Sequence, residues 1–125
     1  NGVYTAAQAD RGEAVFKATC LECHVPEDYQ AEAFKSKFVG GTVFDMWDLI
    51  RTSMPQNNPG SLTKEQYTDV VAYLFKLNAL PAGETELPPV ADSLKKIKVE
   101  AIDPYRLDIR LFTRTNRNHG STRIR

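Results

Sequence analysis

Two cysteines and a histidine form the most restrictive feature of this 125-residue sequence. Cys20 and Cys23 stand three positions apart and His24 follows directly, so that the segment reads C-L-E-C-H. C-x-x-C-H is the attachment pattern of haem c, in which two thiols bond to the porphyrin and the next residue ligates the iron. The pattern predicts one covalently bound haem c, held by Cys20 and Cys23, with His24 as an iron ligand.

A zinc site, a redox-active dithiol and a disulfide each explain the C-x-x-C-H motif less completely than a haem does. A structural zinc ion needs four ligands, and beyond the two cysteines the chain offers only His24 and His119 as soft ligands. A redox-active dithiol usually follows a strand, whereas the residues before Cys20 favour a helix. A plain disulfide would leave His24 without a role. We therefore favour the haem.

Helical spacing of apolar residues predicts three main helices and no strand. Each helix has a threonine at its start and a Gln or Asp three residues later, which is typical of a capping box. The expected helices run from Thr5 toward Cys20, from Thr42 to Ser53 and from Thr63 to Pro81. Gly12 interrupts the first of them, and we expect close approach of another helix at that point, because glycine otherwise weakens a helix.

The length allows one domain with a modest core, which a large cofactor would help to stabilise. We divide the chain into a haem domain at 1–80, an extended segment at 81–104 that packs on it, and a tail at 105–125. Residues 1–104 hold 10 Lys and Arg against 15 Asp and Glu, whereas the tail holds six Arg against one Asp. The tail lacks periodicity, and we expect it to be basic and poorly ordered.

A second axial ligand for the iron is expected at Met54. Met54-Pro55 lies 30 positions after His24 and just past the second expected helix, and Pro55 disfavours helical geometry at Met54. Met46 is the other methionine of the chain, and it shares an apolar helix face with Trp47. We interpret Met46 as a core residue. The predicted metal ligands are therefore His24 and Met54.

Across residues 3–79 the sequence resembles class I, mono-haem c-type cytochromes. The matching motifs are C-L-E-C-H at 20–24, S-M-P at 53–55 and V-V-A-Y-L at 70–74. The resemblance implies an all-α, small cytochrome c fold, with three main helices around the haem and an irregular C-terminal extension. It also implies that the first and last helices cross, with Gly12 and Phe16 against Val70 and Tyr73.

The same resemblance implies further residues at the cofactor. The main-chain carbonyl of Pro26 would accept a hydrogen bond from the imidazole of His24 and fix its orientation. Trp47 would line the haem edge. No cluster of acid, base and nucleophile is evident in the sequence, so we predict no catalytic residues and an electron carrier rather than an enzyme.

A narrower similarity concerns the partners. P-G-S-L-T at 59–63 and the segment 80–87 resemble cytochromes that serve periplasmic dehydrogenases, such as quinoprotein alcohol dehydrogenases. This implies transfer of electrons from a dehydrogenase to a downstream cytochrome or oxidase. It also implies a periplasmic or other extracytoplasmic location, with any signal peptide removed. We expect a monomer or a subunit of a redox complex, with no membrane span and no nucleic-acid partner.

Two alternatives remain open on the sequence. A labile sixth ligand would make the protein a haem-based gas sensor or a peroxidase-like enzyme. The chain would also suit a haem subunit or domain of a larger dehydrogenase complex.

Overall fold

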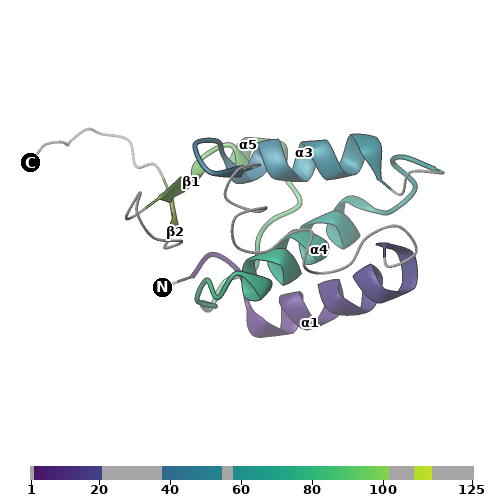
Figure 1. Ribbon diagram of the computed structural model, residues 1–125, viewed down its shortest axis with the longest axis horizontal. Helices are drawn as coiled ribbons and strands as arrows, with labels where there is room; N and C mark the ends of the chain where they lie inside the picture. Colours follow the sequence, from purple (N-terminus) through teal and green to yellow (C-terminus); the bar gives the residue numbers. More distant parts are fainter. Residues whose placement is uncertain (1, 21–37, 55–57, 102–108, 114–125) are drawn as a thin grey trace, which may run out of the picture.

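The computed structural model describes residues 2–20, 38–54, 58–101 and 109–113. Helix α1 (Ala6–Val15) continues into a π-helical turn, η1 (Phe16–Cys20). α1 and α3 (Val43–Ser53) lie on opposite sides of α4 (Lys64–Leu77), as Figure 1 shows. These are the three predicted helices, so that part of the fold prediction is confirmed. Within the described ranges, no helix has both the length and the apolar character needed to cross a bilayer.

The helix starts follow the predicted capping chemistry. The hydroxyl of Thr5 accepts a hydrogen bond from the backbone N–H of Gln8 at 3.1 Å. At the start of α3 and of α4, the capping threonine and the residue three positions later bond to each other's backbone N–H groups. The two reciprocal pairs are Thr42 with Asp45 and Thr63 with Gln66. The caps satisfy N–H groups that would otherwise lack a partner in the first turn.

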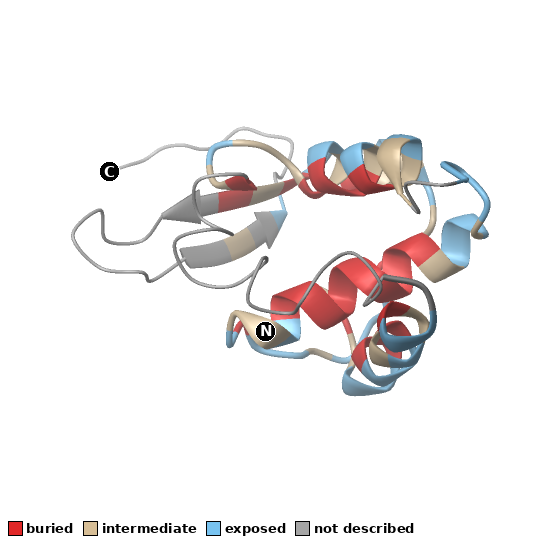
Figure 2. Cartoon of the chain, turned by 45° about the vertical axis from the view of Figure 1, so that its right-hand side comes forward, coloured by how far each residue is buried: buried red, intermediate tan, exposed pale blue. Residues whose placement is uncertain are grey.

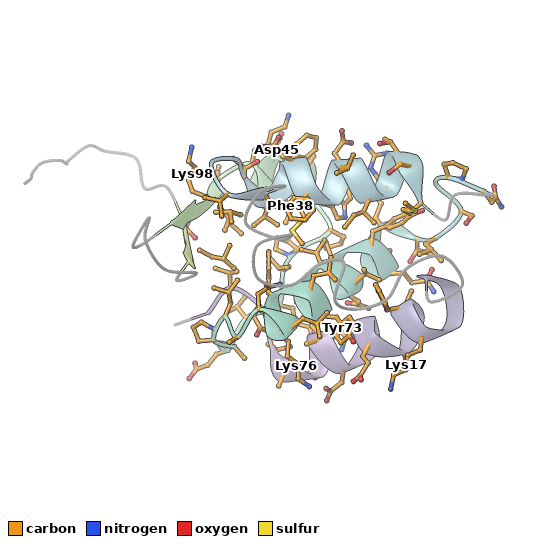
Figure 3. All side chains as sticks on the ribbon, in the orientation of Figure 1. Lys17, Phe38, Asp45, Tyr73, Lys76 and Lys98 are labelled. Atoms are coloured by element: carbon orange, nitrogen blue, oxygen red, sulfur yellow. The ribbon has the colours of Figure 1, made fainter. Side chains whose placement is uncertain are left out.

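Gly12 is the point at which α1 and α4 come closest. A Cβ atom on Gly12 would lie 1.7 Å from the carbonyl oxygen of Asp69 and 3.0 Å from Cβ of Tyr73. One turn further along α1, the rings of Phe16 and Tyr73 lie 5.4 Å apart, and Figure 3 shows Tyr73 between the two helices. The predicted close approach is confirmed, although the main-chain contact is made by Asp69 rather than Val70.

Helix α4 is the centre of the core. Every residue from Tyr67 to Phe75 is buried, as the continuous band of buried colour on α4 in Figure 2 shows. The buried residues extend around the helix rather than along one side, because α1 and α3 cover it from two sides. The carboxylate of Asp69, which is buried as a result, pairs with the Arg11 guanidinium at 3.4 Å.

Residues 80–90, here called the strap, lie against the N-terminal part of α1. The side-chain amide of Gln8 donates to the Leu87 carbonyl at 3.0 Å and accepts from the Leu87 N–H at 2.8 Å. The phenol of Tyr4 donates to the carbonyl of Leu80 at 2.5 Å. These buried polar contacts give the strap a fixed position although it has no regular secondary structure.

A small sheet follows the short helix α5 (Ala91–Leu94). Strands β1 (Ile97–Ala101) and β2 (Ile109–Thr113) pair in antiparallel fashion, with Val99 opposite Leu111. On its other edge, Val99 accepts a hydrogen bond from Gly40 N–H at 2.8 Å and donates one to the Gly41 carbonyl at 2.9 Å. β1 therefore joins the C-terminal part of the chain to the segment that leads into α3.

The prediction of an all-α chain without strands is wrong in this region, and β2 lies within the segment expected to be irregular. Ile97 and Val99 are buried and alternate with the less buried Lys98, which is the two-residue period of a strand. This alternation covers only five residues, too few to separate a strand from a loop on pattern alone. Its partners at 40–41 and 109–113 are distant in sequence, so they gave no local indication.

Candidate haem site

Of the residues predicted to attach the haem and ligate its iron from the C-L-E-C-H motif, the structure describes only Cys20. Cys20 is the last residue of η1, so α1 and η1 lead the chain directly to the attachment motif. Cys23, His24 and Pro26 lie outside the described residues. Their roles therefore stay predictions from the sequence.

Met54 lies immediately after α3 and leaves the helix in an extended conformation, with φ −129° and ψ 148°. Its N–H still donates to the Ile50 carbonyl at 2.8 Å, and its own carbonyl accepts from the phenol of Tyr67 at 2.6 Å. The side chain is partly buried and packs against the core. Pro55 explains this ending, because a residue before proline is restricted to extended geometry.

Met46, the rival methionine, is fully buried within α3. Its position on the helix face that packs into the core fits the interpretation of Met46 as a core residue. Met54 differs because it stands at the end of the helix, where the chain turns toward α4. The structure thus separates the two thioethers into different surroundings.

Trp47 and Arg51 each carry one buried N–H group that has no hydrogen-bond partner in the described part of the chain: Nε1 of Trp47 and Nε of Arg51. The two residues are one turn apart on α3, and the Arg51 guanidinium lies 4.9 Å from the centre of the Trp47 ring. The other side of this guanidinium pairs with Asp48. An unsatisfied buried donor costs about 1–3 kcal/mol, so two neighbouring ones indicate a missing acceptor.

A carboxylate of haem supplies the kind of acceptor that these donors lack. The indole N–H is a donor only, and the guanidinium is a permanently charged donor, so both suit a negatively charged oxygen. The family resemblance implied Trp47 at the haem edge, and it implied no role for Arg51. Its position four residues after Trp47 was the available indication, because residues with this spacing lie on the same side of a helix.

Comparison with known families matches residues 7–74, more than half of the chain. The matched span includes C-L-E-C-H, Met54, nearly all of α1, all of α3 and most of α4. The chain is a mono-haem c-type cytochrome, with one covalently bound haem c and its iron. It belongs to the family described as cytochrome c oxidase, cbb3-type, subunit III. No curated protein and no solved structure gave a significant match.

Membership of this family establishes haem-based electron transfer as the general activity and indicates an electron carrier with redox partners. When bound, haem supplies the one-electron chemistry, and the protein sets its potential and its access to partners. The described residues show a helical frame, two buried N–H groups without acceptors on α3, and a Met54 backbone that is hydrogen-bonded at its N–H and its carbonyl.

Proposed function

We propose that this protein carries single electrons from a periplasmic dehydrogenase to a downstream cytochrome or oxidase. Cys20 and Cys23 hold the haem covalently, and His24 and Met54 fill the two axial positions of the iron. The observation that carries this proposal is the backbone of Met54, which is bonded at its N–H to α3 and at its carbonyl to α4. A residue whose N–H and carbonyl are both hydrogen-bonded is suited to serve as a permanent ligand.

The remaining site residues have supporting roles in this proposal. The Pro26 carbonyl accepts the N–H of the His24 imidazole, which fixes the ring and its tautomer. Trp47 and Arg51 donate to a carboxylate of the haem, so that the cofactor's negative charge is neutralised inside the protein. Methionine ligation together with histidine favours a raised reduction potential, as an electron carrier at the oxidising end of a chain requires.

The fixed backbone of Met54 also argues against the alternatives of a gas sensor and a peroxidase-like enzyme. Both need an open or easily opened sixth position. A haem subunit of a larger dehydrogenase complex would use the same site for the same electron transfer, so this alternative changes the partner and not the chemistry. We place the protein in the periplasm, where c-type cytochromes usually function.

Carbon monoxide binding to the reduced protein at neutral pH tests the proposal. The wild type should not bind carbon monoxide, because Met54 fills the sixth position, whereas Met54→Ala should bind it readily. Met46→Ala is the matched control: it should lose about 2–5 kcal/mol of stability through the cavity it leaves but should not bind the gas. Rapid binding by the wild type would instead support a gas sensor.

A further inference from the structure

Tyr67 connects the two ends of the loop that follows Met54. The residue lies in the first turn of α4 and is 1% exposed. Its hydroxyl donates to the carbonyl oxygen of Met54 at 2.6 Å and accepts from the Leu62 N–H at 3.4 Å. One buried phenol thus links the residue before the loop to a residue at its far end, where Figure 1 shows α3 connecting to α4.

The main chain of Met54 is held on both sides. Its N–H is bonded to Ile50 of α3 at 2.8 Å, and its carbonyl is bonded to Tyr67 of α4. α3 and α4 both pack in the core, so neither anchor moves easily. With both polar groups fixed, the direction of the Met54 side chain is limited to rotation about its own bonds.

We infer that Tyr67 is a positioning residue for Met54: its phenol holds the Met54 carbonyl and so limits how often the Met54 sulfur leaves the iron. This inference rests on the ligation proposed above. An external ligand can enter the sixth position only after the sulfur has moved away. Movement of the Met54 backbone that assists this departure must first break the bond to Tyr67.

Stopped-flow binding of imidazole to the ferric protein measures this directly. At saturating imidazole the observed rate is limited by departure of the Met54 sulfur, and it no longer depends on the imidazole concentration. Tyr67→Phe removes the hydroxyl and keeps the ring that fills the core. We expect this variant to raise the limiting rate about fivefold, as loss of one ordinary hydrogen bond would.

Tyr4→Phe is the matched control, because it also removes a buried phenol that donates to a backbone carbonyl, that of Leu80 in the strap. Both variants should lower the melting temperature, but only Tyr67→Phe should raise the limiting rate. An equal increase in both variants would show a general loosening of the fold and would overturn the inference. An unchanged rate in Tyr67→Phe would also overturn it.

Met54→Ala distinguishes failure of this inference from failure of the proposed ligation. If Met54 is the ligand, the alanine variant should bind imidazole without a limiting rate. If Met54→Ala retains the wild-type limiting rate, another group fills the sixth position, and both the ligation and the role of Tyr67 are wrong. If Met54→Ala loses it while Tyr67→Phe leaves the rate unchanged, only the role of Tyr67 is wrong.

Discussion

At the scale of single residues, the contact between Trp47 and Arg51 is a feature that the sequence pattern does not predict. The apolar periodicity of the second predicted helix assigns Trp47 to the core, but it assigns no role to Arg51 one turn later. The structure stacks the Arg51 guanidinium on the Trp47 ring and buries its Nε atom. A long side chain with an apolar stem can place its charged end in a partly buried site, which residue type alone does not indicate.

Arg51→Gln should lower the reduction potential of the haem. The positive charge of Arg51 opposes the additional positive charge of the oxidised iron, so its loss favours the oxidised state. Trp47→Phe should lower the potential less, since it removes a neutral N–H donor. Arg11→Gln is the control, because it removes the same charge from a residue paired with Asp69 and Glu86. Spectroelectrochemical titration measures all three, and an equal shift in the Arg11 variant would contradict a site at Arg51.

At the scale of secondary-structure elements, the helices could be predicted from the sequence and the sheet could not. The caps at Thr42 and Thr63 and the spacing of apolar residues are local, so the sequence indicates α1, α3 and α4 correctly. Strand β1 depends on partners about 10 residues after it and nearly 60 residues before it. Pairing at such distances is decided by the folded molecule rather than by local preference.

Gly12→Val should strongly destabilise the crossing of α1 and α4. The added Cβ would lie 1.7 Å from the Asp69 carbonyl oxygen, so the helices would have to separate. We expect a loss of about 3 kcal/mol or more in the free energy of unfolding, measured by denaturant titration. Ala7→Val adds comparable bulk to an exposed position of α1 and should cost less than about 1 kcal/mol. Similar losses in both variants would mean that the tight crossing is not the cause.

The strap should add a small pH-dependent term to stability. The Arg11 guanidinium, 2.6 Å from Glu86, lowers the pKa of that carboxyl group below its usual range. A lowered folded-state pKa stabilises the protein above the unfolded-state pKa of about 4.3, and this stabilisation is lost as the pH falls through the folded-state value.

Glu86→Gln should therefore destabilise the protein at pH 7 by less than about 1 kcal/mol, because the pair is largely exposed. The difference from the wild type should shrink as the pH is lowered toward acid. Urea denaturation at several pH values measures it, with Glu84→Gln, at an exposed position of the same strap, as the control. A difference that persisted unchanged at the acid end would indicate that packing, not charge, is lost.

At the scale of the whole molecule, a large covalently bound cofactor explains how a protein with so small a core can be stable. Three helices and a short sheet form a small core, and α4 is buried because α1 and α3 flank it. The attachment motif and Met54 could be predicted as haem residues from the sequence because haem chemistry demands particular residue types at particular spacings, whereas Trp47 was implied only by the family resemblance. The roles proposed for Tyr67 and Arg51 could not be predicted in this way, because each rests on a contact between groups that only the fold brings together.

The reduction potential tests the central claim of His24 and Met54 ligation most directly. The wild type should show one reversible one-electron transition. Met54→Ala should move this transition to a clearly lower potential, because the thioether that raises it is lost. Met46→Ala should leave it almost unchanged. A potential that followed Met46, or that ignored both methionines, would contradict the claim.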